Sequence, residues 1–128
     1  MDDKEMFLMN KVITLTLIKI GIRCDLIGFS YLCSAIKLAI LNPHMLRKIC
    51  KNLYVAVGQE HNVEKTNNVE RSMRHAIDNA FVNQNFSEIN KMFNTILYNA
   101  DEKPTVGELI TLVSDFDTLG LYKNYITI

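Results

Sequence analysis

Two arginines and a histidine lie among regularly spaced apolar residues in the segment NVERSMRHAIDNAFV, residues 68–82. Arginine is a permanently charged donor of several hydrogen bonds, and histidine can donate as well. At 3.6 residues per turn, Arg71 and His75 would project from the side opposite the apolar residues. The segment is therefore either a charged helix on the protein surface or a helix that enters a groove of DNA.

Two faces are expected of this helix. The apolar face would hold Val69, Met73, Ala76, Ile77 and Ala80. The polar face would hold Asn68, Arg71, Ser72, His75, Asp78 and Asn79. Glu70 and Arg74 lie at the margin, four residues apart in the acid-first order that favours an ion pair.

The residues before this helix predict a helix-turn-helix. LYVAVGQEHN, residues 53–62, could form a short helix, and VEKTN, residues 63–67, would form the turn. A helix, a brief turn and a second helix with an exposed N-terminal half is the layout of many DNA-binding domains. Periodicity alone leaves this interpretation open, because every amphipathic helix on a surface has a polar face.

The rest of the chain also predicts short helices. They are expected at residues 2–20, 27–41, 42–53, 85–97 and 104–116. The fold class is therefore all-α, a compact bundle of about six to seven helices around one core. We expect one domain over residues 1–128, with an irregular tail at about 119–128.

Several residues mark the expected helix ends. An aspartate at position 2 or 3 can cap the first helix, and Gly21 can end it. Asn42 and Pro43 stop the second helix and can start a third one. Ser87 is expected to cap the helix at 85–97, Thr105 and Glu108 have capping-box spacing, and Gly120 can end the last helix.

Composition limits the classes of function. The chain has 14 basic and 14 acidic side chains in 128 residues, so its total charge indicates no polyanionic partner. Residues 44–99 carry seven basic and five acidic side chains, whereas residues 100–128 carry two and five. The N-terminus lacks the cationic start of a secretory signal, and the apolar run at 12–22 is too short to span a bilayer. We expect a cytoplasmic protein without a membrane partner.

The sequence predicts no enzyme. It contains no glycine-rich phosphate loop, no HExxH zinc motif and no nucleophile elbow. Cys24, Cys33 and Cys50 lack CxxC spacing, and free thiols in a reducing cytoplasm are the simpler interpretation. Neither a cofactor nor a metal is expected.

Three blocks resemble, in the same order, the DNA-binding effector domain of the master response regulator of endospore formation, the stage zero sporulation protein A family. LY…NVERSMRHAID resembles the family pattern LYPxIAxxxxTTxSRVERAIRHAIE. GIRCDLIGFSYLCSAIKLAI resembles GVPAHIKGYxYLREAI, and EKPTVGELITLVSD resembles KPTNSEFIAMVAD. The matching positions in these two blocks are Gly21, Gly28, Tyr31, Leu32, Ala35, Ile36, Lys103, Pro104, Thr105, Glu108, Ile110, Val113 and Asp115.

The resemblance implies an all-helical domain whose helix-turn-helix binds a short DNA box upstream of sporulation-related genes. The family's regulator has a phosphorylatable receiver domain ahead of this one, and we expect this chain to lack it. Val69-Glu70-Arg71 matches the start of the recognition helix, so Glu70 and Arg71 are expected to contact bases. Arginine can donate two hydrogen bonds to guanine, and glutamate can accept one from cytosine.

The resemblance also implies contacts to the DNA backbone, which do not distinguish one base sequence from another. Arg74 and His75 match the family's Arg-His pair and are expected at the DNA backbone, together with Lys65 and Lys51. Asn68, where the family has an arginine, is also expected to contact a base. For each charged residue the alternative is a solvated helix face, and for Lys51 and Lys65 taken singly it is the better interpretation.

Three departures from the family pattern count against an unchanged copy of the family's DNA-binding helix-turn-helix. Asn68 removes a positive charge. Gly58 replaces an alanine at a cost of about 1 kcal/mol in helix propensity. The stretch from Leu53 to Val69 is one residue longer, so the turn could either tilt the second helix or absorb the extra residue.

Two hypotheses of different classes follow. The first is a transcription regulator whose partner is double-stranded DNA. The second is a protein-interaction module with weakened DNA binding, which pairs with a full-length sporulation regulator or forms a homodimer. That contact would use the C-terminal helix and tail, LITLVSDFDTLGLYKNYITI, because the family makes dimer contacts there.

Overall fold

The computed structural model describes residues 1–116, and in this range every regular element is a helix. The elements are α1 (Asp3–Ile20), α2 (Ile27–Leu41), the short 3₁₀ helix η1 (Pro43–Leu46), α3 (Leu53–Glu60), α4 (Thr66–Asn83), α5 (Ser87–Phe93) and α6 (Val106–Phe116). Their buried side chains form one hydrophobic cluster. The predicted all-α fold of six to seven helices is confirmed. The expected tail and the stop at Gly120 lie outside the described residues.

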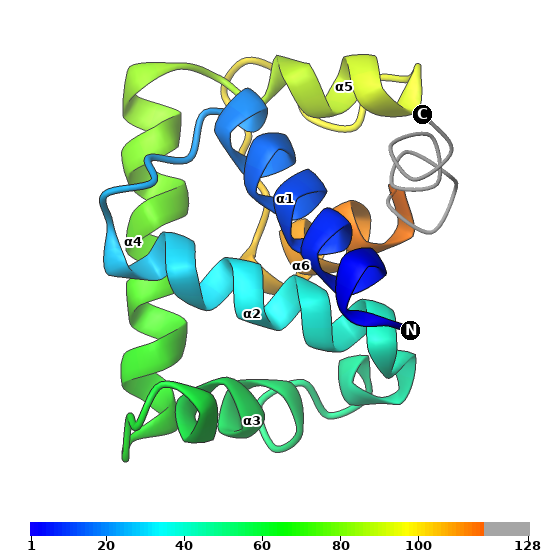
Figure 1. The fold of residues 1–128 in the computed structure, drawn as a ribbon. Coiled ribbons are helices and arrows are strands. Elements are labelled where there is room, and N and C mark those ends of the chain that lie inside the picture. The colour runs from blue at the N-terminus through cyan, green and yellow to red at the C-terminus, as the bar shows by residue number, and fades with distance from the viewer. Residues whose placement is uncertain (117–128) are drawn as a thin grey trace.

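Helix α2 is the centre of the bundle. It packs against α1, α3, α4 and α6, and α4 is the helix it contacts most extensively. Figure 1 shows α4 along one edge of the molecule, with α3 near its start and α5 near its end, while α2 crosses it. The mean hydropathy of α2 is high because it is buried on several sides. A helix enclosed in this way fixes the position of α4.

The contact between α2 and α4 depends on Gly28. A Cβ atom at this position would lie 2.1 Å from the carbonyl oxygen of Ser72, which belongs to the backbone of α4. Only glycine allows the two helices to approach this closely. At the far end of α4, Gln84 Nε2 donates to the carbonyl oxygen of Ile20 at 2.9 Å. Helix α4 is therefore attached to the bundle at its middle and just beyond its end.

Most of the predicted helix ends are confirmed. Asp2 caps α1 in a reciprocal arrangement with Glu5, and Gly21 ends it with a φ of 113°. At α6, the amide of Glu108 donates to Thr105 Oγ1 at 3.1 Å, and the amide of Thr105 donates to Glu108 Oε1 at 2.8 Å. In each of these two capping boxes, side chains accept hydrogen bonds from backbone amides at the start of the helix that have no partner within the helix.

The expected continuous helix over residues 42–53 is wrong. Pro43 does begin a helical turn, but it is the 3₁₀ helix η1, and the chain turns extended at Arg47. Lys48 then takes a left-handed conformation with a φ of 50°. Asn52 Nδ2 donates to the carbonyl oxygen of Arg47 at 2.6 Å and closes the turn. The apolar spacing at Met45 and Ile49 continues through this break, which is why periodicity did not reveal it.

The predicted cap at Ser87 is also wrong. Phe86 occupies the N-cap position of α5, and Ser87 is the first residue of the helix. Phe86 is 1% exposed and stacks on Phe81 with 6.4 Å between ring centroids. Burying a phenylalanine contributes about 2 kcal/mol, more than the roughly 1 kcal/mol of a serine cap. The amide of Ser87 donates to Asn85 Oδ1 instead.

Helix α5 ends earlier than expected. Its C-cap is Asn94, in a left-handed conformation with a φ of 54°. Ile96 and Leu97 therefore lie beyond the helix, and both are exposed. None of the described helices is both long and apolar enough to cross a membrane.

Candidate nucleic-acid interface

Helix α3, a five-residue turn at 61–65 and α4 follow one another in the order expected of a helix-turn-helix. The turn is fixed to α2. His61 Nε2 and Ser34 Oγ are 2.7 Å apart, and the His61 ring meets the Tyr31 ring edge-on at a centroid distance of 5.0 Å. Lys37 Nζ also pairs with Glu60 Oε1 at 2.6 Å. These contacts hold the turn between α3 and α4 in one orientation.

Two of the departures from the family pattern meet at this turn. The amide of Val63 donates to the carbonyl oxygen of Gly58 at 2.8 Å, which folds the turn back onto α3. A Cβ atom at Gly58 would lie 3.0 Å from the carbonyl oxygen of Val63. That distance is tighter than ordinary contact, so the longer turn and the glycine fit each other. The turn accommodates its extra residue because the Val63 carbonyl oxygen packs over Gly58, which has no side chain.

Helix α4 begins two residues earlier than predicted, at Thr66, with Lys65 as its N-cap residue. Its predicted apolar face is confirmed. The buried residues are Val69, Met73, Ala76, Ile77 and Ala80. Asn67 consequently belongs to the first helical turn, where it is exposed, whereas the sequence had placed it in the turn before the helix.

The predicted polar face is only partly open to solvent. Asn68, Arg71 and His75 are exposed, whereas Ser72 is partly covered where α2 approaches at Gly28. Among residues 1–116, nothing accepts a hydrogen bond from the guanidinium group of Arg71, and no carboxylate pairs with it. The donors of Arg71 are therefore available to a partner outside the chain.

Glu70 has a different environment from its neighbour. Arg74 Nη1 and Glu70 Oε1 are 3.1 Å apart, which confirms the predicted ion pair, and the side chains are 55% and 29% exposed. Glu70 also lines a hollow between α3, α4 and the start of α6. An exposed pair of this kind contributes little stability, but it orients both groups.

Basic side chains gather around the start of α3 and α4. Lys51 and the first turn of α4 line the same hollow, and Lys65 stands just before that turn. The sequence analysis did not include two further basic residues, Arg47 and Lys48, which precede Lys51 in the turn before α3. The resulting basic surface consists of Arg47, Lys48, Lys51, Lys65 and Arg71. All five are exposed, and no carboxylate of the described part of the chain pairs with them. The signal for Arg47 and Lys48 was the basic run RKICK directly before the helix-turn-helix.

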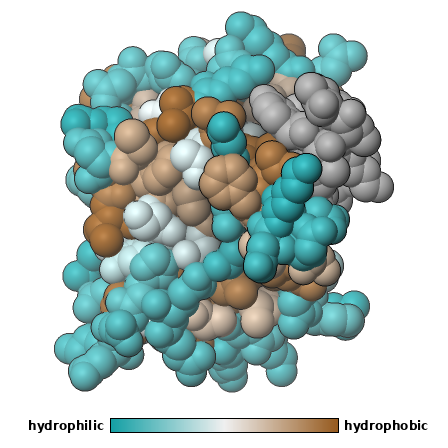
Figure 2. Space-filling model, viewed as in Figure 1, coloured by the Kyte–Doolittle hydropathy of each residue, from teal (hydrophilic) through white to brown (hydrophobic). Residues whose placement is uncertain are grey.

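The total charge hides this surface because acidic residues elsewhere in the sequence cancel its positive charge. Residues 44–75 contain the acids Glu60, Glu64 and Glu70. Glu60 is paired with Lys37 and Glu70 with Arg74, so neither neutralises the basic surface. Figure 2 shows a largely hydrophilic surface over α3 and the start of α4, whereas apolar residues gather over the middle of the molecule.

A family model described as sporulation initiation factor Spo0A C terminal matches residues 13–116. The match covers most of the 128-residue chain. The chain belongs to this Spo0A C-terminal family.

The matched range runs from within α1 to the end of α6. It therefore includes the turn at 61–65 and every residue predicted to contact DNA. It also includes Gly28, so the glycine that lets α2 approach α4 lies within the Spo0A C-terminal match.

Proposed function

We propose that this chain binds double-stranded DNA in a sequence-specific manner and regulates transcription, as a member of a sporulation regulator family. Helix α4 would enter the major groove, whose width accepts an α-helix. The observation that carries the proposal is the state of Arg71 in the first half of α4, which is exposed and has no hydrogen-bond or ion-pair partner among residues 1–116. Such a protein would act in the cytoplasm, where its DNA lies.

The proposed base contacts are those of Arg71, Glu70 and Asn68. Arg71 would donate two hydrogen bonds to a guanine, and Glu70 would accept from a cytosine through Oε2, since Arg74 holds its Oε1. Asn68 is shorter than the family's arginine at this position. Its amide could reach only a base close to the start of α4.

The proposed backbone contacts are those of Arg74, His75, Lys65 and Lys51, and we add Arg47 and Lys48, which are exposed in the turn before α3. Phosphates bind such side chains without regard to sequence, and these contacts set the orientation of a helix in the groove. The fixed turn and the close α2–α4 contact support this arrangement, because they present α4 in one defined position.

Arg71 offers a direct test. We expect Arg71→Ala to weaken binding to a selected DNA site about tenfold to a hundredfold, because a lost bidentate base contact costs about 1 to 3 kcal/mol. Arg71→Lys keeps the charge, so it should retain nonspecific binding while losing preference for the site. Fluorescence anisotropy on selected and scrambled duplexes measures both, with Lys19→Ala on α1 as the matched control. Unchanged site preference in Arg71→Ala would rule out this residue as a base contact.

A second candidate function is self-association, or pairing with a full-length sporulation regulator, through α6. A groove of about 530 Å³ runs along this helix and is lined by apolar residues that include Leu46, Ile49, Leu97 and Leu112. Exposed apolar surface of this kind favours a protein partner. Sedimentation of the full chain, compared with Leu112→Glu, tests a homodimer. A monomer at high concentration would exclude it.

A further inference from the structure

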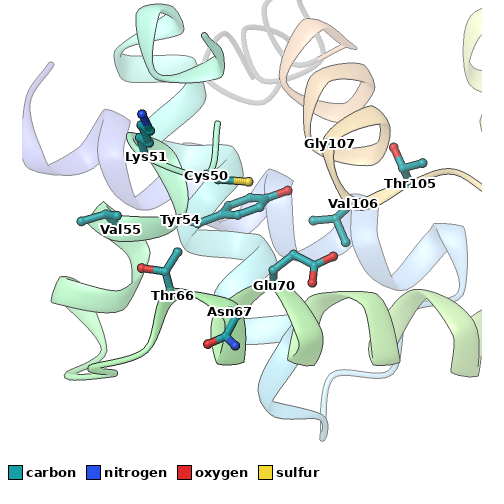
Figure 3. A pocket seen from close by; sticks show the side chains of 10 residues that line it. All are labelled: Cys50, Lys51, Tyr54, Val55, Thr66, Asn67, Glu70, Thr105, Val106 and Gly107. Carbon is teal, nitrogen blue, oxygen red and sulfur yellow. The ribbon is translucent and has the colours of Figure 1, made fainter. Parts of the chain in front are cut away.

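A hollow of about 640 Å³ lies between α3, the first turns of α4 and the start of α6. Sites for small molecules commonly have volumes of about 300 to 1,000 Å³. Figure 3 shows the side chain of Tyr54 at the centre of the lining residues, with Glu70 beneath it and Val106 and Gly107 on the side of α6. The hollow therefore combines apolar walls with a few polar groups, as ligand sites do.

The hydroxyl group of Tyr54 is the first unusual feature of this hollow. Tyr54 is 4% exposed, yet no residue of the described chain forms a hydrogen bond with its hydroxyl group. The ring is buried, but the hydroxyl oxygen is not fully enclosed, because it lies open to the hollow. In Figure 3 the hydroxyl group points into the hollow, toward α6. An oxygen that can accept and donate is therefore open to a ligand.

The carboxylate of Glu70 is the second feature. Glu70 is the only acidic residue that lines the hollow, and its Oε2 has no hydrogen-bond partner among residues 1–116. Its negative charge is close enough to Tyr54 to contribute to raising the pKa of that hydroxyl group, after burial and Cys50. Lys51 also lines the hollow, but its ammonium group points away from Glu70 and from the Tyr54 hydroxyl group (Figure 3).

We propose that this hollow binds a small organic molecule that carries a primary ammonium group on an apolar body. The ammonium group would donate to Glu70 Oε2 and to the Tyr54 hydroxyl oxygen, and three donors on one nitrogen allow both bonds. The apolar body would lie over the Tyr54 ring, against Val106 and Gly107. A cation beside a tyrosine ring gains further attraction from the ring itself. The site shares Glu70 Oε2 with the proposed base contact, so the ligand and DNA would compete for this oxygen, and ligand binding is tested without DNA.

A matched pair of probes tests the charge. We expect 2-phenylethylammonium to bind the full chain in the absence of DNA, with shifts of backbone amide NMR signals confined to α3, the start of α4 and the start of α6. The neutral 2-phenylethanol has the same shape and should bind at least about tenfold more weakly, because it cannot form a charge-assisted hydrogen bond with Glu70. Equal affinity for the two probes, or no saturable binding of the ammonium, would overturn the proposal.

Four variants locate the site. Glu70→Gln should weaken binding of the ammonium about tenfold or more, and Tyr54→Phe several-fold. Arg74→Ala should leave the affinity unchanged or raise it, because it releases the carboxylate from its internal partner. Gly107→Leu should weaken binding, because Gly107 lines the hollow and a larger side chain there would narrow it. Full affinity in Gly107→Leu or Glu70→Gln, with melting temperatures unchanged, would place the probe elsewhere.

Discussion

Neighbouring residues on α4 have distinct environments. Arg71 is exposed and has no partner in the described part of the chain, whereas Glu70 is held by Arg74 and faces the hollow beside Tyr54. A rotation of 100° between successive helix residues separates the two side chains in this way. Sequence periodicity predicted the ion pair and the outward direction of Arg71. It could not predict the hollow, because Cys50, Tyr54, Glu70 and Val106 come from different elements.

Tyr54 leads to a prediction about pH. Burial raises the pKa of its hydroxyl group from 10.0 to about 12, with Cys50 and Glu70 adding to the shift. The group stays protonated in the folded protein while it ionises in the unfolded chain. The stability linked to this difference is present below pH 10 and is lost as the pH rises to about 12.

We expect the free energy of unfolding to fall by about 1 kcal/mol more in the native sequence than in Tyr54→Phe between pH 9 and pH 11. Urea unfolding at pH 9, 10 and 11 measures the difference. The substitution removes no hydrogen bond to any residue in the range 1–116, so the two proteins should have similar stability at pH 9. Parallel pH curves would contradict the assigned pKa shift.

At the scale of helices, glycines determine the two closest contacts around α3 and α4. Gly28→Ala would place a Cβ atom 2.1 Å from a backbone oxygen of α4, so α2 and α4 would have to separate. We expect a loss of about 3 kcal/mol in the free energy of unfolding. Gly107→Ala is the control, because its nearest neighbour would be 3.7 Å away, and it should change stability by less than about 1 kcal/mol. Equal effects in chemical denaturation would contradict the close α2–α4 contact.

Gly58 and the longer turn should be coupled. Gly58→Ala alone gains about 1 kcal/mol of helix propensity but crowds the carbonyl oxygen of Val63, so we expect little net change. Deletion of Asn62, which has a positive φ of 58°, shortens the turn. Combined with that deletion, alanine at position 58 should be stabilising. A double-mutant cycle of unfolding free energies measures the coupling, and additive effects would show that the two features are independent.

The accuracy of each sequence prediction depended on which interaction determines the element. Helix α4 was predicted well because five apolar residues on one stripe must be buried together. The break at Arg47 and Lys48 was missed because no glycine or proline marks it, and Lys48 adopts a positive φ within a hydrogen-bonded turn. Phe86 displaced Ser87 as the N-cap residue because the burial of an aromatic ring outweighs a cap. Local residue preferences predict a helix end only where the packing of the core does not favour a different one.

For the whole molecule, the placement of charge matters more than its sum. The 14 basic and 14 acidic side chains cancel, yet no ion pair within residues 1–116 involves the basic surface. Salt should therefore weaken DNA binding despite the zero net charge, since each phosphate contact contributes about 0.9 to the slope of log affinity against log salt.

The double variant Arg47→Ala/Lys48→Ala should reduce the magnitude of that slope by about 2, while preference among DNA sequences stays unchanged. The control is Lys11→Ala/Lys19→Ala, which removes two exposed lysines from α1. Anisotropy titrations at four salt concentrations provide the slopes. Equal slopes in both variants would remove the turn before α3 from the proposed DNA surface.

Three contacts fix the position of α4. They are the turn at 61–65 before the helix, the approach of α2 at Gly28 near its middle, and the hydrogen bond from Gln84 to the carbonyl oxygen of Ile20 just after its end. In a complex formed as we propose, the duplex would have to bend or change its groove width to match the protein. The energy of that deformation depends on the base steps involved. Selected binding sites should then show preferences at base pairs beyond the reach of any side chain.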